Sequence, residues 1–211
     1  TIYTGVGWMS KEIMEEYSTT FFDCVLEYPE EVQQDIFNLY AYLRVVDEMV
    51  EQTDADGKIY NYKEWRQIIA DFHKVSDKYE FEPEWLASFH QSMFTDVIKK
   101  EHTVMSMLEY CKGSAEAVGC MMARILGCTP DADKYAKALG RAYQIINFVR
   151  DYEDDTSRGY HYINDNFAFY CNMFKNDLEY ALKGMESIPE HLRAPIYKAN
   201  KMYNSIAEKY L

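Results

Sequence analysis

The chain is poor in the two residues that most often interrupt regular structure, with nine glycines and five prolines among 211 residues. The prolines stand at positions 29, 83, 130, 189 and 195, and all but Pro195 fall outside the segments of strong apolar periodicity. No stretch alternates apolar and polar residues as a half-buried strand does. A glycine-rich turn between a strand and a helix is also missing. The sequence therefore predicts an all-helical fold.

Paired cysteines, basic runs and long apolar runs are lacking as well. Five cysteines, an odd number without a Cys-x-x-Cys pair, predict reduced core residues in a cytoplasmic protein. A net charge of −13 without any basic run excludes a nucleic-acid surface and implies that an anionic ligand arrives with metal ions. The longest apolar run, Val118 to Cys128, contains Arg124 and is too short to span a bilayer. The first ten residues show no signal-peptide core.

What the chain does have is helical periodicity along most of its length. A chain of 211 residues suits one domain with a sizeable core, so we expect a single domain over residues 1–211. Asp54 to Gly57 forms a turn, and Thr156 to Asn164 forms a loop. Apolar spacing and cap residues predict a bundle of about eight helices. Their ranges are Ser10–Leu26, Glu30–Glu51, Tyr62–Tyr79, Pro83–Lys100, Thr103–Leu126, Asp131–Asp155, Asp165–Glu186 and Glu190–Tyr210.

One predicted helix ends in a row of oxygen-bearing side chains. Asn147, Asp151 and Asp155 are each four residues apart and stack along one helix face, with the amide of Gln144 near the same line. Like charges at this spacing destabilise a bare helix, so the row favours a bound cation. Mg²⁺ fits, because it takes one or two carboxylates together with waters and substrate phosphates. A solvated acidic face explains the spacing equally well in a chain with 35 acidic residues.

A second acidic cluster closes the helix predicted over Glu30–Glu51. Asp47 and Glu51 are again four residues apart, and Arg44 shares their face. Arg150 stands beside the first row in the same way. If the two clusters face each other across a cavity, they form a metal clamp with arginines ready for diphosphate oxygens.

A third tract places Gly113 and Gly119 inside a helical pattern. Each glycine costs about 1 kcal/mol there relative to alanine, so a close approach or a bend is expected. Tight helix packing and a substrate groove explain these glycines equally well.

These tracts, in this order, resemble the squalene/phytoene synthase family of head-to-head prenyl transferases over nearly the whole chain. The second aspartate-rich tract is the specific one, and the first is degenerate. The matching tracts are Ser18-Thr19-Thr20-Phe21, then Leu39 to Tyr42 with Arg44 and Asp47 to Glu51, then Tyr110-Cys111 with Ala115, Val118 and Gly119, then Leu139-Gly140 with Gln144, Asn147, Arg150-Asp151, Asp155, Arg158-Gly159 and Tyr162, and finally Tyr203.

The resemblance implies an isoprenoid-synthase type of helical bundle around a central cavity that binds two prenyl diphosphates. It implies condensation of farnesyl or geranylgeranyl diphosphate, through a cyclopropylcarbinyl diphosphate, to a linear hydrocarbon such as phytoene, dehydrosqualene or squalene. Mg²⁺, or Mn²⁺ in its place, is implied as cofactor, and NADPH only for squalene. Peripheral membrane contact is expected for release of the hydrocarbon.

The family pattern also assigns roles to individual residues. It implies metal ligation by Asp47, Glu51, Asn147, Asp151 and Asp155. It implies catalytic roles for Tyr110 and for the four carboxylates of that set. It implies substrate binding by Ser18, Phe21, Arg44, Gln144, Asn147, Arg150, Arg158, Tyr162 and Tyr203.

Several positions depart from the family pattern. Glu51 stands where an aspartate is usual, and Thr19 stands where several members carry lysine. Glu116 replaces a glycine of the small-residue helix and is expected to bring a charge near the groove. Tyr160 and Asn164 replace an arginine and a proline of the tail of the second tract.

The sequence also bears on three other functions. A class I terpene cyclase or a head-to-tail prenyl synthase shares the spacing of Asn147, Asp151 and Asp155, but the chain lacks the Asp-Asp-x-x-Asp motif because Arg158 occupies its third aspartate position. A catalytically silent scaffold protein is expected to lose the metal carboxylates, which persist here. A di-iron bundle needs Glu-x-x-His pairs, and no histidine of this chain has a glutamate three residues before it.

Overall fold

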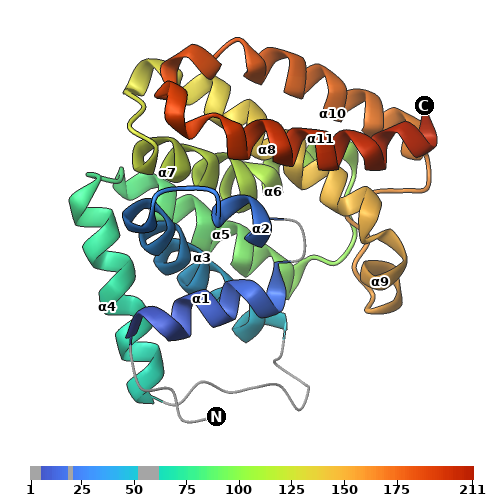
Figure 1. Ribbon diagram of the computed structural model, residues 1–211. Coiled ribbons are helices and arrows are strands. Elements are labelled where there is room, and N and C mark those ends of the chain that lie inside the picture. The colour runs from blue at the N-terminus through green and yellow to red at the C-terminus, as the bar shows by residue number, and fades with distance from the viewer. Residues whose placement is uncertain (1–5, 19–20, 52–61) are drawn as a thin grey trace. The chain divides into compact units, whose positions relative to one another are not determined.

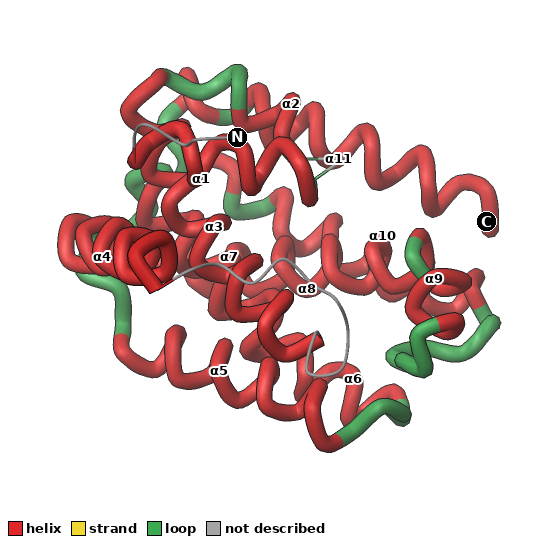
Figure 2. The backbone as a smooth tube through the Cα atoms, turned by 90° about the horizontal axis from the view of Figure 1, so that it is seen from below, coloured by secondary structure: helices red, strands yellow, loops and turns green. Residues whose placement is uncertain are grey.

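The computed structural model describes residues 6–18, 21–51 and 62–211, with the side chains of residues 6–9, 51 and 62 excepted. In these ranges the chain consists of helices and their connections, with one isolated bridge between Glu101 and His161 (Figures 1 and 2). The all-helical class predicted from the sequence is confirmed. The chain divides into two compact units, Thr1–Phe81 and Glu82–Leu211, and the expected single domain over residues 1–211 stays a prediction.

In the first unit the long helix α3 packs against both α1 and α4. Ile13 of α1, Phe37 and Val45 of α3, and Phe72 of α4 are buried in its core. Tyr42 adds a stacked contact with the Phe72 ring, at 4.2 Å between centroids. The helices of this unit are α1 (Val6–Tyr17), α2 (Phe22–Val25), α3 (Glu30–Glu51) and α4 (Tyr62–Lys78).

The prediction of one helix over Ser10–Leu26 is wrong. The helix α1 ends at Tyr17, and the short α2 begins only at Phe22. The Ser18 hydroxyl accepts a hydrogen bond from the backbone N–H of Phe21 at 3.2 Å. Serine side chains compete in this way with helical backbone bonds, which explains the interruption that apolar spacing alone does not show.

In the second unit α8 is the central helix. It contacts α10 and α11 on one side and α7 with the π-helical segment η1 on the other, and η1 contacts α5 (Figure 1). The longer elements are α5 (Pro83–Ile98), α6 (Val104–Cys111), η1 (Lys112–Glu116), α7 (Ala117–Ile125), α8 (Asp133–Arg150), α9 (Tyr152–Ser157), α10 (Phe167–Leu182) and α11 (Ala194–Ala207). Short 3₁₀ turns are η2 (Pro130–Ala132), η3 (Met185–Ser187), η4 (Glu190–Leu192) and η5 (Glu208–Tyr210).

Two long helices predicted in this unit are interrupted in the structure. The range Thr103–Leu126 holds α6, η1 and α7, so its middle turn is π-helical. The range Asp131–Asp155 breaks at Asp151, where φ is −99° and ψ is 9°, and continues as α9. Both interruptions lie in the tracts singled out from the sequence, and the π-helical turn agrees with the tendency of π-bulges to mark functional regions.

Gly113 and Gly119 are explained by tight helix packing, one of the two alternatives left open by the sequence. A Cβ at Gly113 would lie 1.9 Å from the carbonyl oxygen of Ser88 in α5. A Cβ at Gly119 would lie 2.4 Å from the Ala136 carbonyl oxygen, and one at Gly140 would lie 2.3 Å from that of Ala115. The backbones of α8 and of the η1–α7 segment therefore meet directly.

Glu116 belongs to the same packing region. Its carboxylate lies 3.4 Å from the Arg141 guanidinium of α8, which also forms bonds of 2.6 and 2.8 Å to Asp177 of α10. Burial raises the pKa of the Glu116 carboxyl, and the charge of Arg141 opposes that rise. The glutamate that replaces the family glycine is thus part of an ion-pair network that links η1, α8 and α10.

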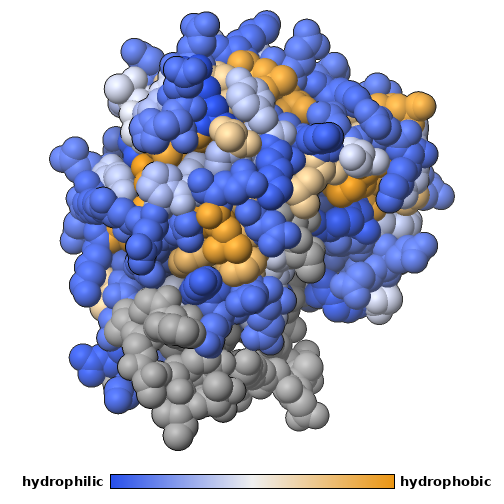
Figure 3. Space-filling view, in the orientation of Figure 1, coloured by the Kyte–Doolittle hydropathy of each residue, from blue (hydrophilic) through white to orange (hydrophobic). Residues whose placement is uncertain are grey.

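No helix in the described part of the chain is long and apolar enough to cross a bilayer. On the face seen in Figure 3, the apolar residues that are described form small separate patches among hydrophilic ones.

Replacement of Gly140 by alanine tests the helix contact. Alanine favours an isolated helix by about 1 kcal/mol, but the clash with the Ala115 carbonyl should outweigh this gain. We expect a net loss of about 1–3 kcal/mol in the free energy of unfolding, measured by urea denaturation. Lys134→Ala on the exposed face of α8 is the control and should stay within about 0.5 kcal/mol of wild type. A Gly140→Ala variant as stable as this control would contradict the close contact.

Candidate functional site

The predicted row of Asn147, Asp151 and Asp155 keeps its spacing through the break between α8 and α9. The Asp151 N–H donates to the Asn147 carbonyl oxygen at 2.9 Å, and the Asp155 N–H donates to that of Asp151 at 2.8 Å. These are helical i,i+4 bonds, so the three residues remain in one register although Asp151 leaves helical geometry. This set is called the acidic ladder.

The side-chain carbonyl oxygen of Asn147 is buried and accepts no hydrogen bond within the described residues. A buried acceptor left in this state costs about 1–3 kcal/mol, so it indicates a place for a bound donor or cation. Asn147 as a whole is half-buried, while this oxygen is removed from solvent. An amide oxygen with two carboxylates in register is an oxygen donor set that suits Mg²⁺.

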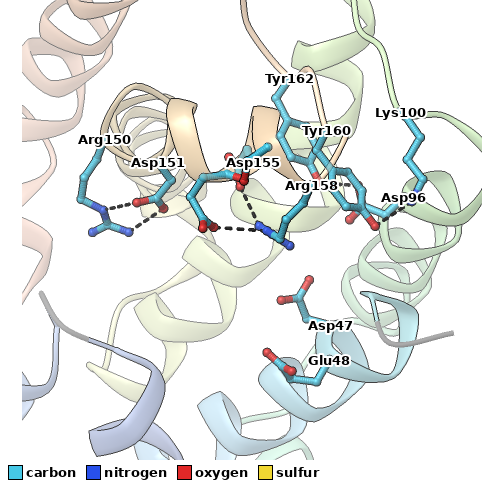
Figure 4. A network of polar contacts seen from close by, with 12 residues as sticks. Asp47, Glu48, Asp96, Lys100, Arg150, Asp151, Asp155, Arg158, Tyr160 and Tyr162 are labelled. Atoms are coloured by element: carbon cyan, nitrogen blue, oxygen red, sulfur yellow. Dashed lines mark hydrogen bonds and ion pairs between the residues drawn. The ribbon is translucent and has the colours of Figure 1, made fainter. Parts of the chain in front are cut away.

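Two arginines lie directly against the ladder (Figure 4). The Arg150 guanidinium contacts both carboxylate oxygens of Asp151 at 2.7 and 2.9 Å, and its pKa is raised mainly by this bond. Arg158 contacts Asp155 at 2.8 Å and Asp154 at 3.2 Å. Carboxylates and guanidiniums are thus side by side, and a metal–diphosphate complex needs both, since metals bind carboxylates while phosphate oxygens bind guanidiniums.

Within the described residues, no three His, Cys, Asp or Glu side chains converge as a ready-made metal site. A site on the ladder would therefore combine Asn147 and a small number of carboxylates with phosphate and water oxygens, which is the usual coordination of Mg²⁺. The predicted metal ligands of this unit stay predictions.

The first unit carries the other acidic cluster on α3. Arg44 contacts the carboxylates of Asp47, at 3.3 Å, and of Glu48, and its guanidinium lies 4.4 Å from the centre of the Tyr17 ring. Burial raises the pKa of Tyr40, one turn before Arg44, to about 12. Glu48, only 8% exposed, is a partner of Arg44 that the sequence did not single out. A carboxylate four residues after an arginine was the available signal.

The remaining residues predicted in this unit have different outcomes. Ser18 and Phe21 contact each other through the bond from the Phe21 N–H to the Ser18 hydroxyl. The side chain of Glu51 and the whole of Thr19 lie outside the described residues. The predicted cavity between the two acidic clusters concerns both units together and stays a prediction.

Asp96 of α5 is the main site residue that sequence reasoning missed. It is 1% exposed, and its two carboxylate oxygens accept hydrogen bonds from the hydroxyls of Tyr110 at 2.7 Å and Tyr162 at 2.6 Å. Both tyrosines were predicted as site residues, and Asp96 brings them together. The signal was its position on the apolar face of α5 with Phe89 and Met93, where a carboxylate needs a partner.

Aromatic rings pack around Tyr162, one of the two partners of this carboxylate. Tyr162 stacks against Phe148 at 4.6 Å, against His102 at 5.5 Å and against Tyr160 at 5.7 Å between centroids. Tyr110 lies 5.1 Å from Tyr162. The five rings, together with Asp96, are called the tyrosine cluster.

Tyr160, which departs from the family pattern, is bound by cations from two elements. The ammonium of Lys100 donates to its hydroxyl at 2.8 Å and lies 4.0 Å from the ring centre (Figure 4). Arg158 lies 5.5 Å from the same ring. Since Arg158 also binds Asp155, a continuous set of contacts joins the acidic ladder to the tyrosine cluster.

Two further predicted residues are Tyr203 of α11 and Gln144 of α8. Tyr203 of α11 is 1% exposed and stacks on Tyr143 of α8 at 4.5 Å, and the Tyr143 hydroxyl bonds to Asn200. Gln144 is half-buried one turn before Asn147.

The chain is similar to proteins of known activity. It is 24% identical to a 4,4'-diapophytoene synthase of Staphylococcus haemolyticus, over 92% of this chain and 84% of that protein. It is 27% identical to a phytoene synthase of Thermus thermophilus, over 69% of this chain and 55% of that protein. The chain thus spans most of the first relative and little more than half of the second.

Solved structures share the fold. A dehydrosqualene synthase crystal structure matches with a TM-score of 0.80 and 20% identity, over 97% of this chain and 87% of the other. A squalene synthase, HpnC of Alicyclobacillus acidocaldarius, matches with a TM-score of 0.76 and 15% identity, over 97% and 92%. The family model described as squalene/phytoene synthase matches residues 14–167. Because this match covers most of the chain, the protein belongs to the squalene/phytoene synthase family.

Proposed function

We propose that the chain is a Mg²⁺-dependent prenyltransferase that condenses two prenyl diphosphates head to head into a linear hydrocarbon. The observation that supports this most is the acidic ladder, with the unpartnered amide oxygen of Asn147, in a chain of the squalene/phytoene synthase family. The names of the relatives point to the same class of product.

The residues of the ladder fit a magnesium site in their chemistry. Asn147, Asp151 and Asp155 would hold the ion by amide and carboxylate oxygens, and Asp47 and Glu51 would do so on α3. Bound there, the ion would supply Lewis-acid stabilisation to the departing diphosphate. Mn²⁺ has the same preference for oxygen ligands and would serve in its place.

The side chains of the protein itself have three tasks in this proposal. Arg150, Arg158 and Arg44 bind diphosphate oxygens, for which a planar guanidinium is well suited. Ser18, Phe21, Gln144 and Tyr203 complete the substrate contacts predicted from the family pattern. The tyrosine cluster offers electron-rich ring faces that stabilise an allylic cation, and its burial keeps water from quenching that cation.

In the proposed reaction one diphosphate leaves, and the double bond of the second substrate attacks the resulting allylic carbon. Loss of a proton closes a cyclopropane ring. Loss of the second diphosphate then leaves a carbocation, which rearranges and loses a second proton to give the neutral hydrocarbon. We favour the non-reductive, phytoene-like outcome with farnesyl or geranylgeranyl chains, so NADPH would be required only if the product were squalene. Release of such a product favours peripheral contact with a membrane.

Product analysis tests the function. The protein is incubated with Mg²⁺ and farnesyl or geranylgeranyl diphosphate, with and without NADPH, and the products are identified by mass spectrometry. We expect a linear hydrocarbon with twice the carbon number of the substrate, loss of activity with EDTA, and recovery with Mg²⁺ or Mn²⁺. A cyclic product or an elongated prenyl diphosphate would instead favour the cyclase or head-to-tail alternative. Complete inactivity would favour the silent scaffold.

Replacement of Asp151 by asparagine tests the ladder. The variant keeps the shape of the side chain but removes the charge that holds a metal against the diphosphate. Its ion pair with Arg150 is partly exposed, so we expect the free energy of unfolding to change by no more than about 1 kcal/mol. The turnover number should fall by roughly a hundredfold or more, which equals about 2.7 kcal/mol of transition-state stabilisation.

Glu153→Gln is the matched control, because it removes the same charge two residues away at an exposed position of α9. Its turnover should stay close to that of wild type. Equal losses at positions 151 and 153, or none at 151, would show that the ladder is a solvated acidic face.

A further inference from the structure

The buried carboxylate of Asp96 has partners that are far apart in the sequence. Tyr110 lies 14 residues away and Tyr162 lies 66 residues away, and each hydroxyl donates to a different oxygen of this one carboxylate. Asp96 is 1% exposed, Tyr110 is 6% exposed and Tyr162 is 9% exposed. A carboxylate removed from water requires such donors, and in return it fixes the direction of both phenol groups.

We propose that Asp96 is a positioning residue that orients the hydroxyls of Tyr110 and Tyr162 for the condensation. This inference rests on the proposed function. Each phenol hydroxyl donates to Asp96, and this bond fixes the direction of the oxygen lone pairs. A phenol that donates to a carboxylate is also richer in electrons, which strengthens its interaction with a carbocation.

Contacts of the tyrosine cluster connect the two phenols with the acidic ladder. Tyr162 stacks between the rings of Phe148 and Tyr160, and Phe148 directly follows Asn147 in α8. Arg158 contacts both the Tyr160 ring and the Asp155 carboxylate. The phenols held by Asp96 therefore lie next to the residues that are proposed to hold the diphosphate end of the substrate (Figure 4).

A second buried carboxylate differs from Asp96 in where its partners lie. Asp71 of α4 is 3% exposed, and it contacts Gln67 at 3.0 Å and Lys74 at 3.6 Å, both on the same helix. Asp71 thus stabilises its own helix, whereas Asp96 joins α5 to α6 and to the segment that follows α9. Asp71→Asn is therefore a control for the loss of a buried charge.

The experiment is steady-state kinetics with Mg²⁺ and the prenyl diphosphate that wild type accepts. In Asp96→Asn the amide accepts one phenol but must donate toward the other, so one hydroxyl reverses. We expect kcat to fall on the order of tenfold to a hundredfold, the usual range for a lost charge-assisted hydrogen bond. KM should remain close to wild type, because the diphosphate is held elsewhere. Asp71→Asn should lower the melting temperature and leave kcat unchanged.

The double variant Asp96→Asn/Tyr110→Phe separates positioning from stability. If Asp96 acts through the phenols, the double variant should lose much less activity than the product of the two single losses. Independent effects on kcat, or an Asp96→Asn variant with wild-type kcat, would overturn the inference while leaving the proposed function intact. A wild-type protein that forms no product would overturn both. Should Asp96→Asn fail to fold, Tyr162→Phe removes one donor and keeps the carboxylate, and it must then show the same fall in kcat at unchanged KM.

Discussion

The direct backbone contact between α8 and the η1–α7 segment is the constraint on which the second unit depends. Gly119 and Gly140 permit it, since a Cβ at either position would lie within 2.4 Å of a carbonyl oxygen on the other element. The same approach brings Gly113 against α5, and so fixes α5, η1, α8 and α10 as one packed stack. This packing also positions three residues of the tyrosine cluster. Phe148 at the end of α8, Tyr110 at the end of α6 and Asp96 at the end of α5 can meet only because these helices pack so closely.

Positive side chains lie beside both acidic tracts. Each acidic tract carries an arginine against its carboxylates, Arg44 on α3 and Arg150 with Arg158 beside the ladder. In a chain of net charge −13 these arginines limit the repulsion within the tracts. They also leave a group of the right kind for a phosphate oxygen once a metal takes a carboxylate. Tyr160 stands where the family pattern has an arginine. Lys100 and Arg158 both contact its side chain and so bring positive charge to this position.

The fold class, most helix positions and the register of the ladder could be predicted from apolar periodicity, because that pattern records which face of a helix is buried. The ends and breaks could not. Ser18 interrupts a helix through one side-chain bond, and Asp151 leaves helical geometry while its N–H still bonds to Asn147, and neither changes the periodicity. Asp96 was missed because its partners are 14 and 66 residues away, so only tertiary structure brings them together. The resemblance to the family supplied the tyrosines but gave no reason to connect them.

The central claim is that Asn147, Asp151 and Asp155 form a metal site for a prenyl diphosphate. Its most direct test is a crystal structure of the protein with Mn²⁺ and a non-hydrolysable prenyl thiodiphosphate, in which anomalous scattering locates the ions. We predict an anomalous peak about 2.0–2.3 Å from oxygens of the ladder and of the diphosphate, the distances typical of such hard cations. A diphosphate bound away from the ladder, or a ladder without an anomalous peak while the ligand is bound, would contradict the account.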